Sequence, residues 1–334
     1  MKAYEIVSDG GVDALALNER PDPKPGPGEV LVRVRASSIN YRDLSTVEAP
    51  VPRGIPYPRI PNSDGAGDVV EVGPGVTRWK AGDKVCGCFF QGWLDGHTTP
   101  EWAAQALGGT IDGMLAEYRV LRQDGLVPMP DHLSYEEAST LPCAALTAWH
   151  SLAEVGQVKA GSTVLLLGTG GVSVFALQFC KMMGVRAICT SSSDEKIARL
   201  KEMGADETVN YRTHPEWQEK VLELTDGKGV DHTVEVGGAG TLERSIASTR
   251  IAGSIGLIGV LTGGKIDPVM IMRKSIRLQG IYVGSRRMFE EMNTAISQHA
   301  LKPVISDTFA FGDARDAFHA MRAAGHFGKL VVKI

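Results

Sequence analysis

A glycine-rich segment offers the clearest chemistry in this sequence, because its spacing suits the binding of a phosphate group. Gly168-Thr169-Gly170-Gly171-Val172-Ser173 follows the apolar run Thr163–Leu167 and leads into a helical pattern that ends near Met183. A strand, a tight turn and a helix N-terminus present backbone N–H groups and the helix dipole to a pyrophosphate. Gly168 permits the turn, Gly170 lets a phosphate approach the backbone, and Ser173 stands where a small residue packs helix on strand. The alternative is an ordinary glycine-rich turn.

A run of three serines indicates which dinucleotide this loop prefers. An acidic residue about 20 positions after the loop would bind the ribose 2′-hydroxyl of NAD, but here Ser191 follows the second strand. The hydroxyls of Ser191, Ser192 and Ser193, with Lys196 one turn later, suit a 2′-phosphate, which an acid would repel. We therefore predict NADPH as the coenzyme. Two alternatives stay open: Ser192 and Glu195 form a capping box, or Asp194 and Glu195 accommodate NAD.

The elements that must position these residues change in kind along the chain. Residues 29–35, 67–72 and 84–88 read as short strands separated by glycine-rich turns, which predicts an all-β first unit. From about residue 141, apolar strands at 163–167, 186–190, 232–236 and 255–258 alternate with helical patterns at 172–183, 194–203, 215–225 and 242–248. This alternation predicts a doubly wound parallel sheet. A helix at 313–324 and a final strand at 328–334 are expected to rejoin the first unit.

Composition excludes several classes of function. The chain has 334 residues, a formal charge of -4 and 43% hydrophobic residues, with no basic cluster interleaved with aromatics, so nucleic acid is not expected as a partner. No apolar run approaches the length of a membrane span or a signal peptide. Five cysteines without disulfide-framework spacing read as thiols, which predicts a cytoplasmic protein.

These motifs, together with Pro27–Val32, Asn40–Asp43, Pro61–Gly67 and Leu141–Ala148, resemble the medium-chain dehydrogenase/reductase superfamily over essentially the whole chain. The sequence is most similar to its zinc-independent alcohol dehydrogenase-like and quinone oxidoreductase-like members. The resemblance implies an α/β protein with a GroES-like β-rich catalytic domain at residues 1–127 and 285–334. It implies a Rossmann NADP-binding domain at residues 128–284.

The same resemblance speaks against a catalytic zinc. Zinc members of the family use a Cys, a His with a neighbouring acid, and a later Cys, whereas this chain has Asn40, Ser63, Asp64 and Cys143 at those places. A catalytic zinc needs three protein ligands and an open fourth position, so no metal is predicted. The close pair Cys86 and Cys88 has no further cysteines near it for a structural zinc.

The family's catalytic loop corresponds to Asn40, Tyr41 and Asp43, and we predict these as catalytic residues. Asn40 can donate an amide hydrogen bond to a developing oxyanion, Tyr41 can donate a proton, and Asp43 can orient its neighbours. The alternative is structural, with Asn40 as a cap and Asp43 paired with Arg42 or Arg53.

The resemblance also implies the residues that contact the coenzyme and the substrate. Tyr211 would lie beside the adenosine phosphate, and Lys329 would face the pyrophosphate unless it is merely solvated. The predicted coenzyme-binding set is Thr147, Gly168, Thr169, Gly170, Gly171, Val172, Ser191, Ser192, Ser193, Lys196, Tyr211, Val236, Gly259, Val260, Val283 and Lys329. The predicted substrate pocket is Phe90, Trp93 and Cys143, although core packing is the alternative for each.

The predicted activity is NADPH-dependent hydride transfer to a small apolar carbonyl, enone or quinone without a metal. An NADP-dependent alcohol dehydrogenase or ketone reductase is the alternative enzyme, and an NADPH-binding sensor or structural protein is the alternative without turnover. A homodimer is expected through the β-rich segment at residues 276–282, because an unpaired edge strand is a liability that pairing removes.

Overall fold

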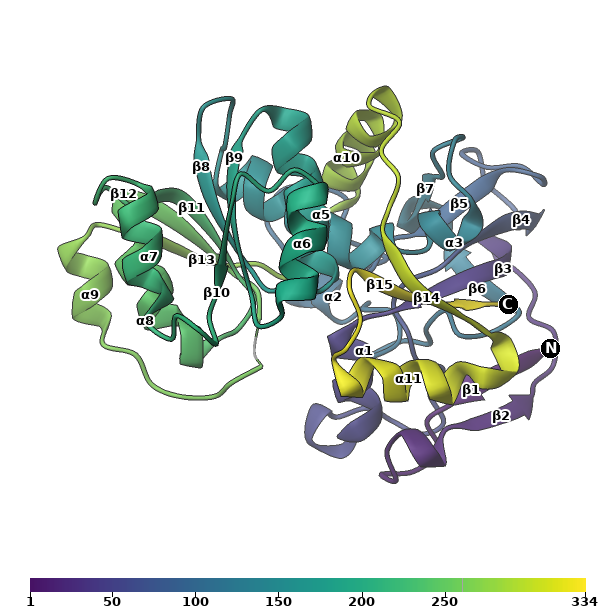
Figure 1. The fold of residues 1–334 in the computed structure, drawn as a ribbon. Coiled ribbons are helices and arrows are strands. Elements are labelled where there is room, and N and C mark those ends of the chain that lie inside the picture. Colours follow the sequence, from purple (N-terminus) through teal and green to yellow (C-terminus); the bar gives the residue numbers. More distant parts are fainter. Residues whose placement is uncertain (260) are drawn as a thin grey trace. The chain divides into compact units, whose positions relative to one another are not determined.

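The computed structural model describes residues 1–259 and 261–334, and the chain divides into two compact units (Figure 1). The first unit contains Met1–Leu146 and Val283–Ile334, and the second contains Thr147–Tyr282. The first boundary lies later than the expected residue 128, because residues 135–138 and 141–145 pack against the sheet of the first unit. Residues 141–145 contact β5 (Lys84–Gly87), which pairs antiparallel with β7 (Leu126–Pro128). The second boundary lies close to the expected residue 285.

The first unit is organised around the long strand β3 (Glu29–Ile39). Its sheet has the order β14-β15-β3-β4-β5-β7, with β6 also pairing to β3. The last strand, β15, pairs antiparallel with the carboxyl half of β3, which confirms that the end of the chain rejoins this unit. The remaining strands of this sheet are β4 (Ala66–Val72), β6 (Tyr118–Arg122), β14 (Ile305–Ala310) and β15 (Lys329–Lys333). A separate two-stranded sheet contains β1 (Lys2–Glu5) and β2 (Ala16–Glu19).

The expectation of an all-β first unit is wrong at α1 (Tyr41–Glu48). Asn40 has an extended backbone and caps this helix, and the Asp43 carboxylate accepts a hydrogen bond from the Asn40 backbone N–H at 2.9 Å. α11 (Ala314–Ala323) lies beside α1 (Figure 1), where Leu44, Val47 and Phe318 belong to one buried apolar cluster. The remaining helices of this unit are α2 (Pro100–Ala103), α3 (Tyr135–Ala138) and α10 (Arg286–Gln298).

The second unit contains the predicted doubly wound sheet. Six parallel strands have the order β10-β9-β8-β11-β12-β13. The strand order reverses between β8 and β11, and open parallel sheets bind ligands outside the carboxyl ends of the strands at such a point. The strands are β8 (Thr163–Leu167), β9 (Arg186–Ser191), β10 (Glu207–Asn210), β11 (Val230–Glu235), β12 (Thr249–Leu257) and β13 (Arg277–Gly280).

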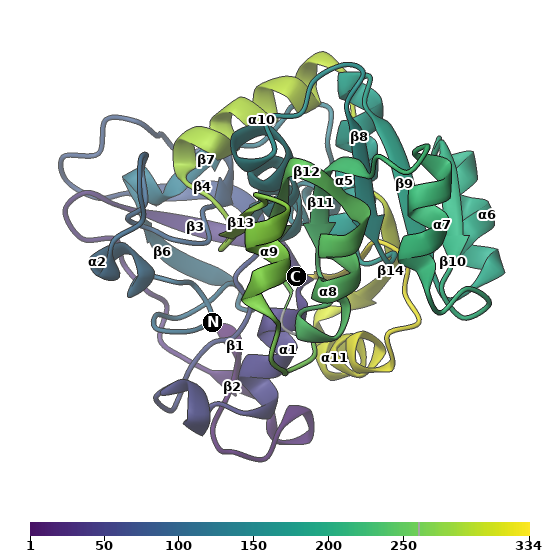
Figure 2. The ribbon, with the colours of Figure 1, turned by 90° about the vertical axis from the view of Figure 1, so that its left-hand side faces the viewer.

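Helices cover this sheet as the alternating pattern predicts. α8 packs against β11 and β12 and against α9 (Figure 2), and Leu165, Ile188 and Trp217 share a buried cluster. The helices are α4 (Leu146–Trp149), which contains the boundary between the units, α5 (Gly171–Met183), α6 (Asp194–Glu202), α7 (Trp217–Leu224), α8 (Ala239–Ser248) and α9 (Pro268–Arg273). Within the described ranges, no helix combines the length and apolar character needed to cross a membrane.

A buried histidine lies in β11 at the centre of the second unit. The side chain of His232 is fully buried, with Nε2 2.9 Å from Ser151 Oγ and Nδ1 2.8 Å from Ser254 Oγ. Burial, with a smaller contribution from Arg277, lowers the pKa of His232 to about 3. The folded state therefore keeps a neutral imidazole at pH values where an unfolded chain binds a proton.

This difference predicts a loss of stability at acid pH. Between about pH 6.5 and pH 3 the unfolded state binds one more proton at this position, so unfolding becomes easier by up to ~1.4 kcal/mol per pH unit as the pH falls. In urea titrations from pH 6 to pH 4, wild type should lose stability more steeply than His232→Gln by about this amount. The exposed-site control His299→Gln should follow wild type. Equal slopes for wild type and His232→Gln would contradict the prediction.

Candidate functional site

The glycine loop after β8 has the conformation and the space that a phosphate requires. Gly168 has a left-handed φ of 74°, which favours glycine, and Gly170 is the extended N-cap of the 13-residue helix α5. A Cβ added at Gly168 or Gly170 would meet no atom within 4 Å. Ser173 Oγ donates to the Leu167 carbonyl at 2.6 Å, which confirms the predicted helix–strand packing. The cradle for a pyrophosphate is therefore open at the N-terminus of a long helix.

The serine run lies at the carboxyl end of the neighbouring strand β9. Ser191 is 2% exposed, and its Oγ accepts a hydrogen bond from the Ser193 N–H at 3.3 Å. The alternative capping box of Ser192 with Glu195 is wrong, because α6 begins one residue later than that box requires. Ser193 is the N-cap, and its Oγ accepts from the Lys196 N–H at 3.3 Å.

The first turns of α6 carry Lys196 and Arg199 as well as the acids Asp194 and Glu195. The pKa of Lys196 is lowered by partial burial and by the nearby cation of Arg199, and such mutual repulsion is relieved when an anion binds. Tyr211 is 40% exposed, and its backbone N–H donates to the Ser191 carbonyl at 3.0 Å. The structure thus brings Tyr211 next to the serine run, whereas the carboxylate of Asp194 accepts from Asn210 Nδ2 at 2.7 Å.

The loop after β11 is held by a carboxylate that the sequence reading missed. Glu235 is fully buried, and its Oε1 accepts from the backbone N–H groups of Gly237 at 2.7 Å and Gly238 at 3.1 Å. Thr241 Oγ1 donates to the same oxygen at 2.6 Å, and Ser245 Oγ donates to Oε2. This carboxylate fixes the loop that faces the reversal of strand order. An acidic residue at the end of an apolar strand is the sequence signal that could have identified Glu235.

The remaining residues predicted to contact the coenzyme lie at strand ends or near the unit boundaries. A Cβ at Gly259 would stand 1.6 Å from the Val236 carbonyl oxygen, so only glycine permits this close approach of two backbones. Val260 lies outside the described residues. Thr147 is 3% exposed. Val283 is 4% exposed and has a φ of 57°, which is strained for a β-branched residue and is often found at functional sites.

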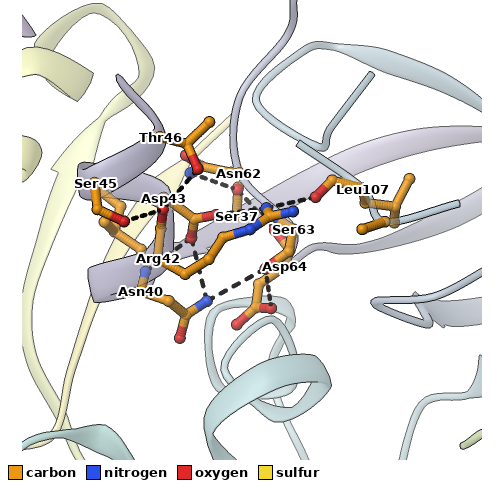
Figure 3. Close-up of polar contacts among 12 residues, drawn as sticks. Ser37, Asn40, Arg42, Asp43, Ser45, Thr46, Asn62, Ser63, Asp64 and Leu107 are labelled. Atoms are coloured by element: carbon orange, nitrogen blue, oxygen red, sulfur yellow. Dashed lines mark hydrogen bonds and ion pairs between the residues drawn. The ribbon is translucent and has the colours of Figure 1, made fainter. Parts of the chain in front are cut away.

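In the first unit, the predicted catalytic loop forms part of a buried polar network (Figure 3). Asn40 Nδ2 lies 3.3 Å from Asp43 Oδ2 and 3.5 Å from Ser63 Oγ. Asp43 Oδ1 accepts from the Ser63 backbone N–H at 3.2 Å and lies 3.3 Å from Arg42 Nη1. Asp43 is fully buried and orients its neighbours, whereas Tyr41 at the start of α1 is 46% exposed. The alternative in which Asp43 pairs with Arg42 is therefore also found in the structure.

Lys329 enters this network from the opposite end of the sequence. It is 2% exposed, so the alternative of a solvated lysine is wrong. Its Nζ donates to the Ile39 carbonyl at 3.0 Å and to Asn40 Oδ1, and it lies 3.6 Å from Asp64 Oδ2. The β15–β3 pairing, in which Leu330 faces Ile39, explains how the side chain arrives there. The predicted contact between Lys329 and the pyrophosphate stays a prediction.

The Asp64 carboxylate is surrounded by donors. Ser38 Oγ donates to Oδ2 at 2.8 Å, and Ser63 Oγ donates to Oδ1 at 3.0 Å. Burial raises the pKa of Asp64, and the ammonium of Lys329 opposes this rise. Burial likewise raises the pKa of the Cys143 thiol, so Cys143 carries its proton at neutral pH.

These residues do not fit a catalytic zinc. Across residues 1–259 and 261–334, no three His, Cys, Asp or Glu side chains are grouped so that they could hold a metal ion. An amide and a hydroxyl at Asn40 and Ser63 are poor zinc ligands, and the Cys143 thiol is protonated. The buried ammonium of Lys329 would also repel a divalent cation.

The residues predicted for the substrate pocket differ in exposure. Phe90 and Trp93 are 2% and 5% exposed, and their rings pack 5.9 Å apart in the first unit. Trp93 Nε1 donates to the Gly96 carbonyl at 2.9 Å. Cys143 is half-buried. All five cysteines are free thiols, as predicted.

Comparison with protein families identifies both units. A model described as an alcohol dehydrogenase GroES-like domain matches residues 26–131. A model described as a zinc-binding dehydrogenase matches residues 171–298. The two matches lie in the first and the second unit for most of their length.

Individual proteins match over nearly their full length. A zinc-type alcohol dehydrogenase-like protein of Schizosaccharomyces pombe is 42% identical over 340 residues, which covers 98% of each chain. A quinone oxidoreductase of Pseudomonas aeruginosa is 30% identical over 346 residues and 99% of each chain. Among solved structures, an NAD-dependent alcohol dehydrogenase has a TM-score of 0.91 and 33% identity, with complete coverage of both chains. A mycobacterial protein complexed with NADPH has a TM-score of 0.85 and 28% identity, again with complete coverage.

The open space at Gly170 predicts a selective effect on coenzyme binding. Gly170→Ala should weaken binding of NADPH and NADH at least tenfold, because the added methyl group occupies the space that a phosphate needs. The cost in stability should stay near ~1 kcal/mol, the usual size for alanine at an N-cap. Isothermal titration and urea unfolding measure the two effects. Gly325→Ala, where a Cβ also meets nothing within 4 Å, is the control. Unchanged affinity in Gly170→Ala would remove the loop from the binding site.

Proposed function

The chain belongs to the medium-chain dehydrogenase/reductase family, and we propose that it is an NADPH-dependent, metal-free reductase of activated carbonyls, enones or quinones. It is an oxidoreductase, as its relatives are, so the alternative of a protein without turnover is set aside. The observation that carries the finer proposal is the network around Asn40, in which an amide is held for hydrogen bonding where zinc relatives would hold a metal.

The proposed reaction needs a hydride donor, a hydrogen-bond donor and a proton donor. The nicotinamide coenzyme supplies a hydride when bound by the loops of the second unit. In the first unit, the Asn40 amide N–H stabilises the oxygen on which negative charge develops, and Tyr41 donates the proton. Asp43 is too deeply buried to reach a substrate, so it positions Asn40 through the hydrogen bonds to its backbone and side chain.

NADPH as the coenzyme is supported by the environment of the serine run. Ser192 and Ser193 are half-buried at the end of β9, Tyr211 lies beside this end, and Lys196 stands one turn into α6. The structure related to this chain that contains NADPH agrees with this choice, whereas the NAD-dependent alcohol dehydrogenase argues for NAD. Asp194 Oδ1 accepts a hydrogen bond from Asn210 Nδ2, and this contact supports the choice of NADPH because a ribose 2′-hydroxyl would compete with it.

A substitution at Lys196 tests the coenzyme. Lys196→Ala should raise the Kd of NADPH by ~10- to 100-fold, the effect of losing one charge-assisted contact with a phosphate, and leave the Kd of NADH within about threefold. Fluorescence titration with both nucleotides measures this. Lys201→Ala on the same helix, where the side chain is exposed, is the matched control. Tighter binding of NADH than NADPH by wild type would overturn the assignment.

The choice of acceptor tests the metal-free mechanism. With NADPH, para-quinones and α,β-unsaturated ketones should be reduced with a kcat/KM at least 100-fold above that for oxidation of simple alcohols with NADP⁺. These acceptors delocalise the incoming charge themselves, so they need only a hydrogen bond from the protein. Tyr41→Phe should lower kcat by ~10- to 1,000-fold if Tyr41 supplies the proton.

Two controls accompany this comparison. Elemental analysis of the purified protein should find less than a tenth of a zinc ion per chain, and one tightly bound zinc per chain would refute the mechanism. Faster oxidation of alcohols by the metal-free protein would favour the alternative alcohol dehydrogenase. An unchanged rate in Tyr41→Phe would remove Tyr41 as the proton donor.

A homodimer is supported by the outer edge of the parallel sheet. β13 pairs with β12 on one side, and within the described part of the chain no strand pairs with its other side. Tyr282 beside it is 54% exposed. Pairing with a second copy would satisfy the exposed backbone groups of this edge. A cytoplasmic location is likewise retained as a proposal, supported by the free thiols.

A further inference from the structure

The Asn40 amide lies between charges of opposite sign. Its carbonyl oxygen accepts a hydrogen bond from the Lys329 ammonium, while its Nδ2 faces the Asp43 carboxylate at 3.3 Å. Turning the amide over would place NH₂ against the ammonium and the carbonyl oxygen against the carboxylate. Both exchanges are repulsive, and burial strengthens them because little water screens the charges. The orientation of this amide is therefore set by electrostatics as well as by packing.

Basic and acidic side chains surround Asn40 in one cluster. Lys329 and Arg42 carry the positive charges, and Asp43 and Asp64 carry the negative ones. Lys329 is the member that contacts the carbonyl side of the amide, and a cation on that side draws electron density from the nitrogen. The Nδ2 hydrogens consequently become stronger donors, as in any chain of polarised hydrogen bonds.

The Asn40 amide also hydrogen-bonds the Asp64 carboxylate, in addition to its contacts with Asp43 and Ser63. The contact from Nδ2 to Asp43 is 3.3 Å, whereas the contact to Ser63 Oγ is 3.5 Å, the limit of a hydrogen bond. The Ser63 hydroxyl also donates its own hydrogen to Asp64 at 3.0 Å, so it keeps its place without Asn40. In the proposed reaction, an oxyanion takes the place of Ser63 as the acceptor at this long contact.

We propose that Lys329 is a positioning residue for the reaction: its buried ammonium orients and polarises the Asn40 amide, and so strengthens the hydrogen bond from that amide to the reacting oxygen. This inference rests on the proposed function, because it requires Asn40 to stabilise the reacting oxygen. It differs from the role that the family resemblance implies for Lys329, which is contact with the coenzyme pyrophosphate.

The two roles separate in kinetics. A positioning residue acts in the transition state, so Lys329→Met should lower kcat for a para-quinone by ~10- to 100-fold, less than the ~100- to 1,000-fold for loss of an oxyanion donor itself, with KM and the Kd of NADPH changed less than threefold. A pyrophosphate contact would instead raise the Kd of NADPH with kcat retained at saturation. Lys329→Arg, which keeps the charge, should recover at least tenfold in kcat over Lys329→Met. The control Lys333→Met, at an exposed position of the same strand, should behave as wild type.

Removing a buried cation leaves Asp64 without its counter-charge, so a second variant protects the test from misfolding. Lys329→Met combined with Asp64→Asn removes both charges, and circular dichroism checks its fold. This pair should lower kcat at least tenfold in the wild-type background but less than threefold in an Asn40→Ala background, because the lysine acts through the amide.

Each outcome bears on one proposal. Equal losses of kcat in the two backgrounds would overturn the coupling between Lys329 and Asn40, and so would a raised Kd of NADPH with unchanged kcat. If wild type binds NADPH but reduces no acceptor, the proposed function fails. If wild type reduces quinones and Lys329→Met does so equally well, only the role of Lys329 fails.

Discussion

The first unit depends on a single buried ammonium. Lys329 cannot leave water without acceptors, and the structure supplies them from Ile39, Asn40 and Asp64, which belong to segments far apart in the sequence. Loss of one partner from a buried ion pair usually costs about 3–5 kcal/mol. The requirement therefore holds the last strand, the end of β3 and the segment after residue 62 in one arrangement. The cap of α1 and the orientation of the Asn40 amide follow from that arrangement.

In the second unit, a buried carboxylate holds the loop after β11 in place. Glu235 ends the strand β11, and its oxygens accept from two glycine N–H groups and two hydroxyls. Glycines give the loop the freedom to approach other backbones closely, but they also leave it without side chains that would hold its shape. The carboxylate provides that constraint. Ionised donors and acceptors thus fix the loops of both units, while apolar packing fixes the strands and helices.

Local patterns in the sequence predict the second unit well. The strand 163–167 and the helix that ends at Met183 are formed by short-range periodicity, and the structure has them at nearly the predicted residues. The first unit is harder, because α1 has few apolar positions and depends on a cap at Asn40. The burial of Lys329 depends on pairing between residues about 290 positions apart. No local pattern distinguishes such a lysine from a solvated one. Glu235 differs, because its donors lie within ten residues of it, in the loop and in α8, but no sequence pattern shows that the loop folds back onto the carboxylate.

The difference between an amide and a metal restricts the direction of the chemistry. Zinc binds an alcohol and lowers its pKa, so it assists removal of hydride from an alkoxide as well as addition of hydride to a carbonyl. An amide N–H cannot accept the proton of an alcohol, and one such donor is worth about 2.7–4 kcal/mol toward a developing oxyanion. The carboxylates nearest to Asn40 already accept hydrogen bonds. Asp43 accepts from the backbone N–H groups of Asn40 and Ser63. Asp64 accepts from the hydroxyls of Ser38 and Ser63. Under the proposed function, a network with an oriented donor and with its carboxylates engaged favours addition of hydride to an acceptor that already stabilises negative charge.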